Sequence, residues 1–201
     1  MEAELQSAVA EYFVHGRGMC ETTIGEGSRV WAHAHVMKNA HVGNECNIGE
    51  GSFVEGGAYV GDRCTIKNGV SVWDGVMLES DVFVGPNAVF TNDMIPRTKS
   101  INPHYEMVRT TVKRGASIGA NATIVCGITI GEFAMIGAGS VVTKDVPPYA
   151  LVFGNAARIR GWVSMKGHKL LFDENGRAED SDGSTYFFNG DFVELLSPPI
   201  E

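Results

Sequence analysis

The chain has 201 residues, of which 44% are hydrophobic and 20% charged, and its formal net charge is −8 at pH 7. These values are typical of a soluble globular protein with one domain, or one domain and an appendage. The negative charge argues against a general nucleic-acid binder. No apolar run approaches the roughly 20 residues of a membrane span.

The N-terminal segment and the cysteines both indicate a cytoplasmic protein. The first twenty residues contain three glutamates and no apolar segment, so we expect no signal peptide. The cysteines show no CxxC spacing, which predicts reduced thiols in place of a zinc site or a disulfide framework. The four cysteines are Cys20, Cys46, Cys64 and Cys126.

From Ile24 an aliphatic residue or Phe recurs at every sixth position as far as Phe90, which makes twelve hexads in register. Six more hexads run from Val112 to Val142. A small residue usually stands two positions before the recurring one, and Gly often follows it. Neither a helix nor an ordinary exposed strand has a period of six. A parallel β-helix does, because each hexad then supplies one short strand and a turn around an inward aliphatic side chain.

The interruption between Phe90 and Val112 equals one hexad and sixteen further residues. An insertion of this length in so regular a body is usually functional. We therefore expect an extruded loop near residues 91–111 that contributes to a site, with a tolerated surface insertion as the alternative.

This pattern resembles the hexapeptide-repeat acyltransferases. The resemblance implies an all-β fold, a left-handed parallel β-helix in which three hexads make one triangular coil. Eighteen hexads would then give about six coils. It also implies a homotrimer, since members of this family usually trimerise to cover their flat apolar faces, and a loop that reaches over the subunit boundary.

With three hexads in each coil, residues eighteen apart lie one above the other. Asp74 then lies beneath Asn92, and Cys126 falls in the same column one coil further once the insertion is removed. We expect Cys46 and Cys64, also eighteen apart, to be two core thiols in contact. The Asp74–Asn92 column has two interpretations, a functional site at the root of the loop and a structural ladder that caps turns.

A more specific resemblance lies in KNGVSVWDGVMLESDVFVGPNAVFTNDMIPR (Lys67 to Arg97), with SRVWAHAHV before it and GANATIVCGITIG after it. These segments resemble N-acetyltransferases that act on nucleotide-linked 3-amino sugars, with a UDP or dTDP carrier, for bacterial surface polysaccharides such as lipopolysaccharide. The similarity covers roughly residues 13 to 163. It implies that Asn92 contacts the acceptor amine and that Asp93 and Asp74 are the accompanying catalytic acids.

The chemistry of an amine acceptor suits these residues. A sugar amine titrates at roughly 8, like an α-amino group, so it is partly neutral and nucleophilic at physiological pH. Its attack on a thioester requires orientation more than a strong base. A hydroxyl acceptor would need a base such as His. The alternatives are therefore a sugar O-acetyltransferase that uses His104 in the loop, and a catalytically silent β-helix scaffold.

Other histidines give weaker signals. His33 and His35 stand beside Trp31, where a base or sugar could stack. The histidines at 33, 35 and 41 share no eighteen-residue column, so no metal site is expected.

The segment GAGSVVTKDVPPYALVFGNAARIRG (Gly137 to Gly161) resembles the end of the β-helix in members that use acetyl-CoA. The resemblance implies that Ala120 and Ala138 line a groove for the pantetheine arm of this acyl donor. Thr143, Lys144 and Arg158 would contact its nucleotide end. Five basic residues against one acid between Lys144 and Lys169 agree with phosphate binding, although a solvated basic face is the alternative.

The chain divides shortly after Gly161, where the segment that resembles the end of the β-helix stops. Residues 1–163 are predicted to form the acyltransferase domain. Residues 164–201 are predicted to form a small β-hairpin appendage, with turns at residues 174–176 and at Asn189–Gly190.

Overall fold

The computed structural model describes residues 12–104 and 106–199 of the chain. The three glutamates that argue against a signal peptide lie outside this range. The described residues form strands and turns, and among them no helix is long and apolar enough to cross a membrane. The predicted all-β fold is confirmed.

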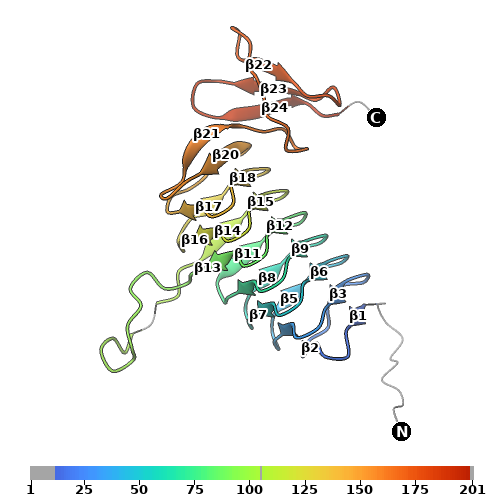
Figure 1. Ribbon diagram of the computed structural model, residues 1–201, viewed down its shortest axis with the longest axis vertical. Coiled ribbons are helices and arrows are strands. Elements are labelled where there is room, and N and C mark those ends of the chain that lie inside the picture. The colour runs from blue at the N-terminus through green and yellow to red at the C-terminus, as the bar shows by residue number, and fades with distance from the viewer. Residues whose placement is uncertain (1–11, 105, 200–201) are drawn as a thin grey trace.

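Most of the strands form three parallel sheets, which we call faces A, B and C (Figure 1). Face A contains β1 (Phe13–Val14), β3 (Arg29–Val30), β6 (Asn47–Ile48), β9 (Thr65–Ile66), β12 (Phe83–Val84), β15 (Ser117–Ile118), β18 (Met135–Ile136), β20 (Ala150–Phe153) and the antiparallel β21 (Arg158–Trp162). Face B contains β2 (Met19–Cys20), β4 (His35–Val36), β7 (Phe53–Val54), β10 (Ser71–Val72), β13 (Val89–Phe90), β16 (Thr123–Ile124) and β19 (Val141–Val142). Face C contains β5 (His41–Val42), β8 (Tyr59–Val60), β11 (Val76–Leu78), β14 (Thr110–Val112) and β17 (Thr129–Ile130).

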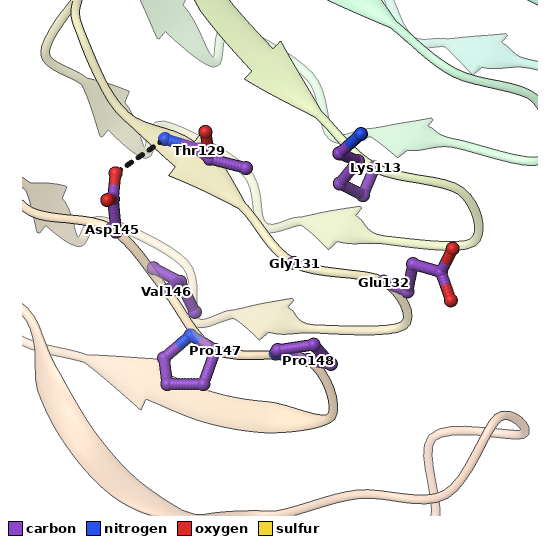
Figure 2. Close-up of a pocket in the computed structure, with 8 residues that line it drawn as sticks. All are labelled: Lys113, Thr129, Gly131, Glu132, Asp145, Val146, Pro147 and Pro148. Carbon is purple, nitrogen blue, oxygen red and sulfur yellow. Dashed lines mark hydrogen bonds between the residues drawn. The ribbon is translucent and has the colours of Figure 1, made fainter. Parts of the chain in front are cut away.

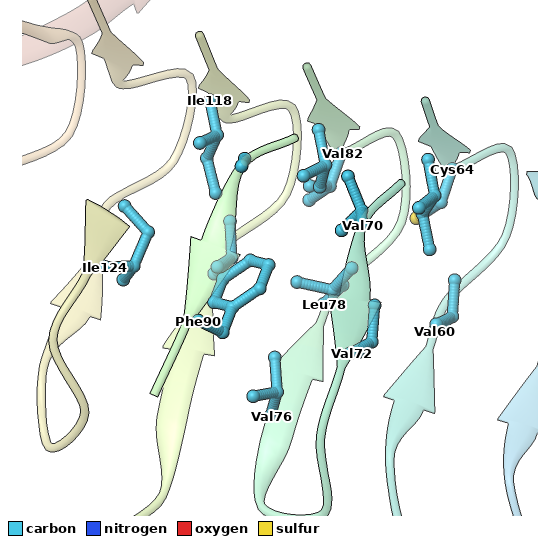
Figure 3. Packing of buried hydrophobic residues seen from close by; sticks show 14 of the residues in the cluster. Val60, Cys64, Val70, Val72, Val76, Leu78, Val82, Phe90, Ile118 and Ile124 are labelled. Carbon is cyan, nitrogen blue, oxygen red and sulfur yellow. The ribbon is translucent and has the colours of Figure 1, made fainter. Parts of the chain in front are cut away.

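The register of these sheets follows the hexads. Val30 pairs with Ile48, eighteen residues later, and Ile48 in turn pairs with Ile66. Each of these three side chains is fully buried, and side chains at the same position of the other hexads fill the centre of the coil (Figure 3). Most hexads also bury the side chain two positions before the recurring one, such as Cys64, Val70 or Val82, so each layer extends a narrow apolar column.

The β-helix is taller than the predicted six coils. Face A holds eight parallel layers, from β1 to β20. At its two ends the paired residues are sixteen apart, Phe13 with Arg29 and Ile136 with Val152. These terminal layers are two residues shorter than a regular coil, and a count of hexads therefore misses them.

The predicted loop leaves the β-helix between β13 and β14 and projects away from it (Figure 1). Val112 pairs with Leu78, and Thr123 pairs with Val89, which is the register expected after removal of sixteen residues. The insertion therefore leaves the coils above and below it in phase.

The predicted thiol pair is part of the core. All four cysteines are free, and both Cys46 and Cys64 are buried. The interaction between the two thiols raises the pKa of Cys64, with burial adding to the effect, and lowers the pKa of Cys46. Each thiol also donates a hydrogen bond to a backbone carbonyl, Cys46 to Gly61 at 3.0 Å and Cys64 to Glu79 at 3.1 Å.

A C-terminal antiparallel sheet of β22 (Arg177–Glu179), β23 (Thr185–Phe188) and β24 (Val193–Ser197) covers the end of the β-helix. Tyr149, from the last coil, packs in a second apolar cluster with Tyr186 of this sheet, and Trp162 contacts both clusters. The turn at Asn189 connects β23 with β24 as predicted. The turn before Gly176 also forms, but it leads into β22. β22 pairs with β23 through a turn at 180–184 that was not predicted.

Candidate functional site

The turns that follow the strands of face B form one edge of the prism, which we call the B–C edge. Its successive layers place Asp74, Asn92 and Cys126 in one column, as predicted, because β10, β13 and β16 pair in register. The same pairing continues to β19 and adds Lys144 to the column. A predicted acceptor residue and a predicted donor residue therefore lie on one edge, two layers apart.

Asn92 is held where the loop leaves this edge. Its Nδ2 donates a hydrogen bond to the Asp74 carbonyl oxygen at 3.3 Å. Its own carbonyl oxygen accepts one from the Val108 amide at 3.0 Å, which closes the base of the loop. Beside it, the Trp73 indole N–H donates to the Phe90 carbonyl at 3.0 Å. Asn92 thus performs the turn-capping role of the structural interpretation, while its Oδ1 makes no hydrogen bond within the described residues.

The Asp74 carboxylate faces a cavity of about 290 Å³. The Asp74 amide donates to Glu55 Oε2 at 2.9 Å, which fixes the backbone of this turn. Gly57 lies one layer below with a φ of 97°, and a Cβ there would collide with Asp74 Oδ1. Glycine at position 57 is therefore what leaves room for the carboxylate.

Asp93 makes a structural contact at the start of the loop, and its catalytic role stays a prediction. Its Oδ1 accepts a hydrogen bond from the Ile95 amide at 2.8 Å, which shapes the first turn of the loop. Neither Asp93 nor Asn92 is among the residues that line the cavity with Asp74. The structure therefore brings Asp74 and Asn92 together but leaves Asp93 at the start of the loop.

Arg109 lies on the returning limb of the loop, which is the part that leads into β14. It occupies the position in its layer that a count forward from Phe90 assigns to Asp93. The amide of Thr110 donates to the Gly75 carbonyl at 3.0 Å, and the Gly127 amide donates to the Arg109 carbonyl at 3.1 Å. Arg109 therefore lies between Gly75 and Gly127 in the edge ladder. Counting forward from Phe90 predicts Asp93 at this place, whereas counting backward from Val112 predicts Arg109. The backward count from Val112 is therefore the feature of the sequence that could have identified Arg109.

Face C and the loop supply the rest of the cavity wall. Outward side chains of β8, β11 and β14 form its floor, and the returning limb of the loop forms one side. Tyr59 is fixed by stacking on His41, with ring centroids 4.4 Å apart. The lining residues are Gly57, Tyr59, Asp74, Gly75, Val76, Met77, Met107, Arg109 and Thr111.

No histidine is among the residues that line the Asp74 cavity. His104 is exposed in the loop and does not line the cavity. His35 Nε2 lies 2.9 Å from Glu21 Oε1, and His33 is exposed. Residues 12–104 and 106–199 contain no cluster of His, Cys, Asp and Glu that could hold a metal ion.

The predicted donor residues fall into two groups. Thr143, Lys144 and Arg158 line a single pocket of about 230 Å³ at the upper end of the B–C edge. Ala120 and Ala138 lie one above the other on the edge between faces A and B, where the Gly139 amide donates to the Ala120 carbonyl at 2.8 Å. In one chain these two groups lie on different edges of the prism.

Figure 2 shows a further hollow on face C, which is lined by Lys113, Thr129, Gly131, Glu132, Asp145, Val146, Pro147 and Pro148. Its volume is about 420 Å³. Asp145 Oδ1 accepts a hydrogen bond from the Thr129 amide at 2.7 Å and closes one side. The hollow shares Asp145 and Val146 with the pocket of Lys144. Thr129 also pairs with Thr111 of the Asp74 cavity. Three hollows therefore adjoin along face C and the B–C edge.

Comparison with known proteins agrees with this architecture. The profile of the bacterial transferase hexapeptide family matches residues 21–56 and 109–144, and that of the hexapeptide repeat of succinyl-transferase matches 40–73. The dTDP-3-amino-3,6-dideoxy-alpha-D-galactopyranose 3-N-acetyltransferase of Aneurinibacillus thermoaerophilus is 51% identical over 193 residues, 96% of this chain and 99% of that protein. The bifunctional protein GlmU of Thermotoga petrophila is 51% identical over 59 residues, 28% of this chain and 13% of that protein.

Two solved structures are more distant. The acetyltransferase domain of PglB from Neisseria gonorrhoeae FA1090 matches with a TM-score of 0.48 and 22% identity over 74% of this chain and 57% of that chain. A point mutant of GDP-perosamine N-acetyl transferase from Caulobacter crescentus matches with a TM-score of 0.45 and 23% identity over 75% of this chain and 53% of that chain.

The identity to the Aneurinibacillus protein extends over nearly the whole of both chains. The chain therefore belongs to the hexapeptide-repeat acyltransferase family, as its hexads and the segment from Lys67 to Arg97 predicted.

Proposed function

We propose that the protein transfers the acetyl group of acetyl-CoA to the amine of a nucleotide-linked 3-amino sugar. The observation that carries this proposal is the 51% identity to an enzyme named for this reaction, across 96% of the chain. The shared B–C edge of Asp74, Asn92 and Lys144 supports it. The acetylated sugar would serve bacterial surface polysaccharides such as lipopolysaccharide, and the reaction would take place in the cytoplasm.

The Asp74 cavity would hold the amine. Because the amine titrates at roughly 8, a useful fraction is neutral near pH 7 and needs mainly to be oriented. Asp74 would accept a hydrogen bond from the nitrogen, and Asn92 Oδ1 would accept a second one. As the nitrogen bonds to the thioester carbonyl carbon and the C–S bond breaks, the amine loses one proton, to Asp74 or to the departing thiolate. The products are an amide and the free thiol of CoA.

The pocket of Thr143, Lys144 and Arg158 would hold the phosphates of the donor. Lys144 and Arg158 supply two positive charges there, and charge-assisted hydrogen bonds to phosphate are among the stronger ones in proteins. The hollow in Figure 2 adjoins this pocket and leads along face C toward the Asp74 cavity. It offers an apolar path for the acyl arm.

Ala120 and Ala138 would contact the same donor only if the edge between faces A and B of one chain meets the B–C edge of another. We therefore include a homotrimer in the proposal. Large apolar side chains on the outer faces support it, because Phe83, Val89 and Met77 are each 40% or more exposed.

The amine is favoured over the hydroxyl acceptor by the position of the histidines. His104 is the candidate base for O-acetylation, and it lies on the exposed loop away from the cavity lining. A silent scaffold is disfavoured by a cavity that contains an acidic and a basic side chain, Asp74 and Arg109.

One assay tests the proposal. Purified protein is incubated with acetyl-CoA and a panel of UDP- and dTDP-linked 3-amino sugars, and release of free CoA thiol is followed. Each amino sugar is paired with the analogue that carries a hydroxyl at the same carbon. We expect turnover of amino sugars only. Turnover of the hydroxyl analogues, or of no member of the panel, would contradict the proposal.

A further inference from the structure

Arg109 is the cation of the Asp74 cavity, and the predicted chemistry at the amine does not use it. We propose that Arg109 binds the phosphate group attached to the anomeric carbon of the acceptor, while Asp74 and Asn92 hold the amine at the other end. This inference rests on the proposed function and deepens it. It names the residue that selects a nucleotide-linked sugar over a free amino sugar.

The backbone of Arg109 is fixed although it belongs to the extruded loop. Three backbone hydrogen bonds, with N···O distances of 3.0 to 3.1 Å, connect the returning limb to three layers of the prism. The Val108 amide donates to the Asn92 carbonyl, and the Thr110 amide donates to the Gly75 carbonyl. The Arg109 carbonyl accepts the third bond, from the Gly127 amide. A loop residue held in this way behaves as part of the scaffold. Binding through Arg109 then orders its side chain but does not have to order the backbone that carries it.

Glycines make the space around this limb. A Cβ on Gly75 would lie 2.6 Å from Met107 Sδ, and one on Gly127 would lie 3.1 Å from Val108 Cγ1. Side chains at these two positions would push the limb away from the edge. Gly75 and Gly127 therefore let Met107 and Val108 pack against the edge, and the Arg109 side chain is exposed.

The charges of the cavity match a ligand with an amine at one end and a phosphate at the other. Within the described residues, neither Arg109 nor Asp74 forms an ion pair with another side chain, and both line the same 290 Å³ cavity. In a 3-amino sugar, the amine and the anomeric phosphate are on the third and first ring carbons, so a single hexose ring separates them. An Arg guanidinium can bind phosphate through two parallel hydrogen bonds.

The first test compares acceptors with and without the phosphate. Arg109→Met is assayed with the nucleotide-linked 3-amino sugar and with the free 3-amino sugar, next to Arg97→Met as control. Arg97 is an exposed loop residue outside the cavity, and its guanidinium bonds to the carbonyl of Pro96.

For Arg109→Met we expect the KM of the nucleotide-linked acceptor to rise about 10- to 100-fold, from loss of one charge-assisted contact, with little change in kcat. Kinetics with the free amino sugar should not change, and Arg97→Met should match the wild type with both acceptors. An unchanged KM, or an equal loss with both acceptors, would overturn the proposal.

The second test does not depend on turnover. Calorimetric titration with dTDP, UDP and inorganic pyrophosphate should show binding that Arg109→Met weakens at least about tenfold and Arg109→Lys weakens less. If the wild type acetylates no sugar amine but shows this loss, the proposed function fails and the anion site remains. If the wild type is active and Arg109→Met binds and reacts like it, only this inference fails. Absence of binding by the wild type also overturns it.

Discussion

At the scale of single residues, the B–C edge gives one side chain a structural role, to which the proposed function adds a chemical one. Asn92 uses its Nδ2 to cap the turn of Asp74 and keeps its Oδ1 free of partners among the described residues. A turn cap of this kind contributes about 0.5–1.5 kcal/mol. Positioning of an amine contributes more, because it converts an encounter into an oriented attack. The two contributions can be separated by experiment.

Asn92→Ala is expected to lower kcat/KM by about one to three orders of magnitude, through loss of amine positioning. The melting temperature should fall by only a few °C, since one long hydrogen bond is lost and a domain of this size shifts about 2–4 °C per kcal/mol. His104→Ala, measured alongside, should cost less than about tenfold. Abolished turnover in His104→Ala with a mild Asn92→Ala would favour the O-acetyltransferase. A large drop in the melting temperature of Asn92→Ala, with normal kinetics, would show that Asn92 acts only as a turn cap.

Lys144→Ala and Arg158→Ala are expected to raise the KM for acetyl-CoA with little effect on the acceptor KM, because each removes a phosphate contact of about 1.5–3 kcal/mol. Steady-state kinetics with each substrate varied in turn provide the measurement. Lys38→Ala is the matched control, since Lys38 is an exposed lysine in the lower part of the same edge. If the KM for acetyl-CoA were unchanged in both Lys144→Ala and Arg158→Ala, the basic cluster would be a solvated surface and would not bind phosphate.

At the scale of elements, the C-terminal sheet closes the open end of the apolar column. Tyr149 of the last coil is buried against Tyr186, and Tyr186 is completely buried. The polar attachment of this cap is concentrated at Asp180, whose side chain is almost entirely buried and whose Oδ1 lies 2.8 Å from His168 Nδ1. Hydrogen bonds from Ser164 and His168 lower the pKa of Asp180 to about 2.

This lowered pKa predicts how the cap responds to acid. Asp180 has an unfolded pKa of about 3.9, so its contribution is complete above that value and is lost as the pH falls toward about 2. The melting temperature, followed by tryptophan fluorescence, should therefore fall between about pH 4 and pH 2. Asp180→Asn should be less stable at neutral pH and should lose less on acidification. Glu179→Gln, an exposed neighbour, is the control and should behave as the wild type. Equal acid sensitivity of all three proteins would contradict this role for Asp180.

At the scale of the whole molecule, a prism of flat parallel faces exposes apolar side chains that its own core cannot cover. Met19, Val89 and Phe83 illustrate this, with 54%, 49% and 40% of their surfaces exposed on outer strand positions. The two groups of donor residues also lie on different edges of one chain. In the proposed trimer, the edge between faces A and B of one chain would meet the B–C edge of the next. That assembly would cover the exposed apolar side chains and bring the two groups of predicted donor residues together.

Sedimentation at several protein concentrations is therefore expected to give a trimer. A charge placed in the exposed row, as in Val89→Asp, should weaken the assembly and lower activity together, because the donor site would lose one wall. Val89 points outward, so this change should spare the core of the monomer. Fully active monomers would contradict the shared site, and the donor residues of one chain would then suffice.

The sequence alone predicted the elements whose contacts follow from fixed spacing. In a β-helix each residue contacts those one coil away, so a period of six determines the inward side chains, and Asn92 falls above Asp74 without any tertiary information. The site of the loop and the register beyond it followed from the same count. The resemblance of the segment from Lys67 to Arg97 then indicated the family.

Only the tertiary structure decided matters that spacing leaves open. The insertion has two limbs that could fill one place in the edge ladder, and hydrogen bonds to Gly75 and Gly127 gave that place to Arg109 in preference to Asp93. The end layers are two residues short and break the period, so their number was underestimated. The cap is held by irregular contacts such as those of Tyr149 and Tyr186, for which the hexads give no rule. A period specifies contacts between neighbouring coils, whereas loops and ends are placed by packing and hydrogen bonds that have no fixed separation in the chain.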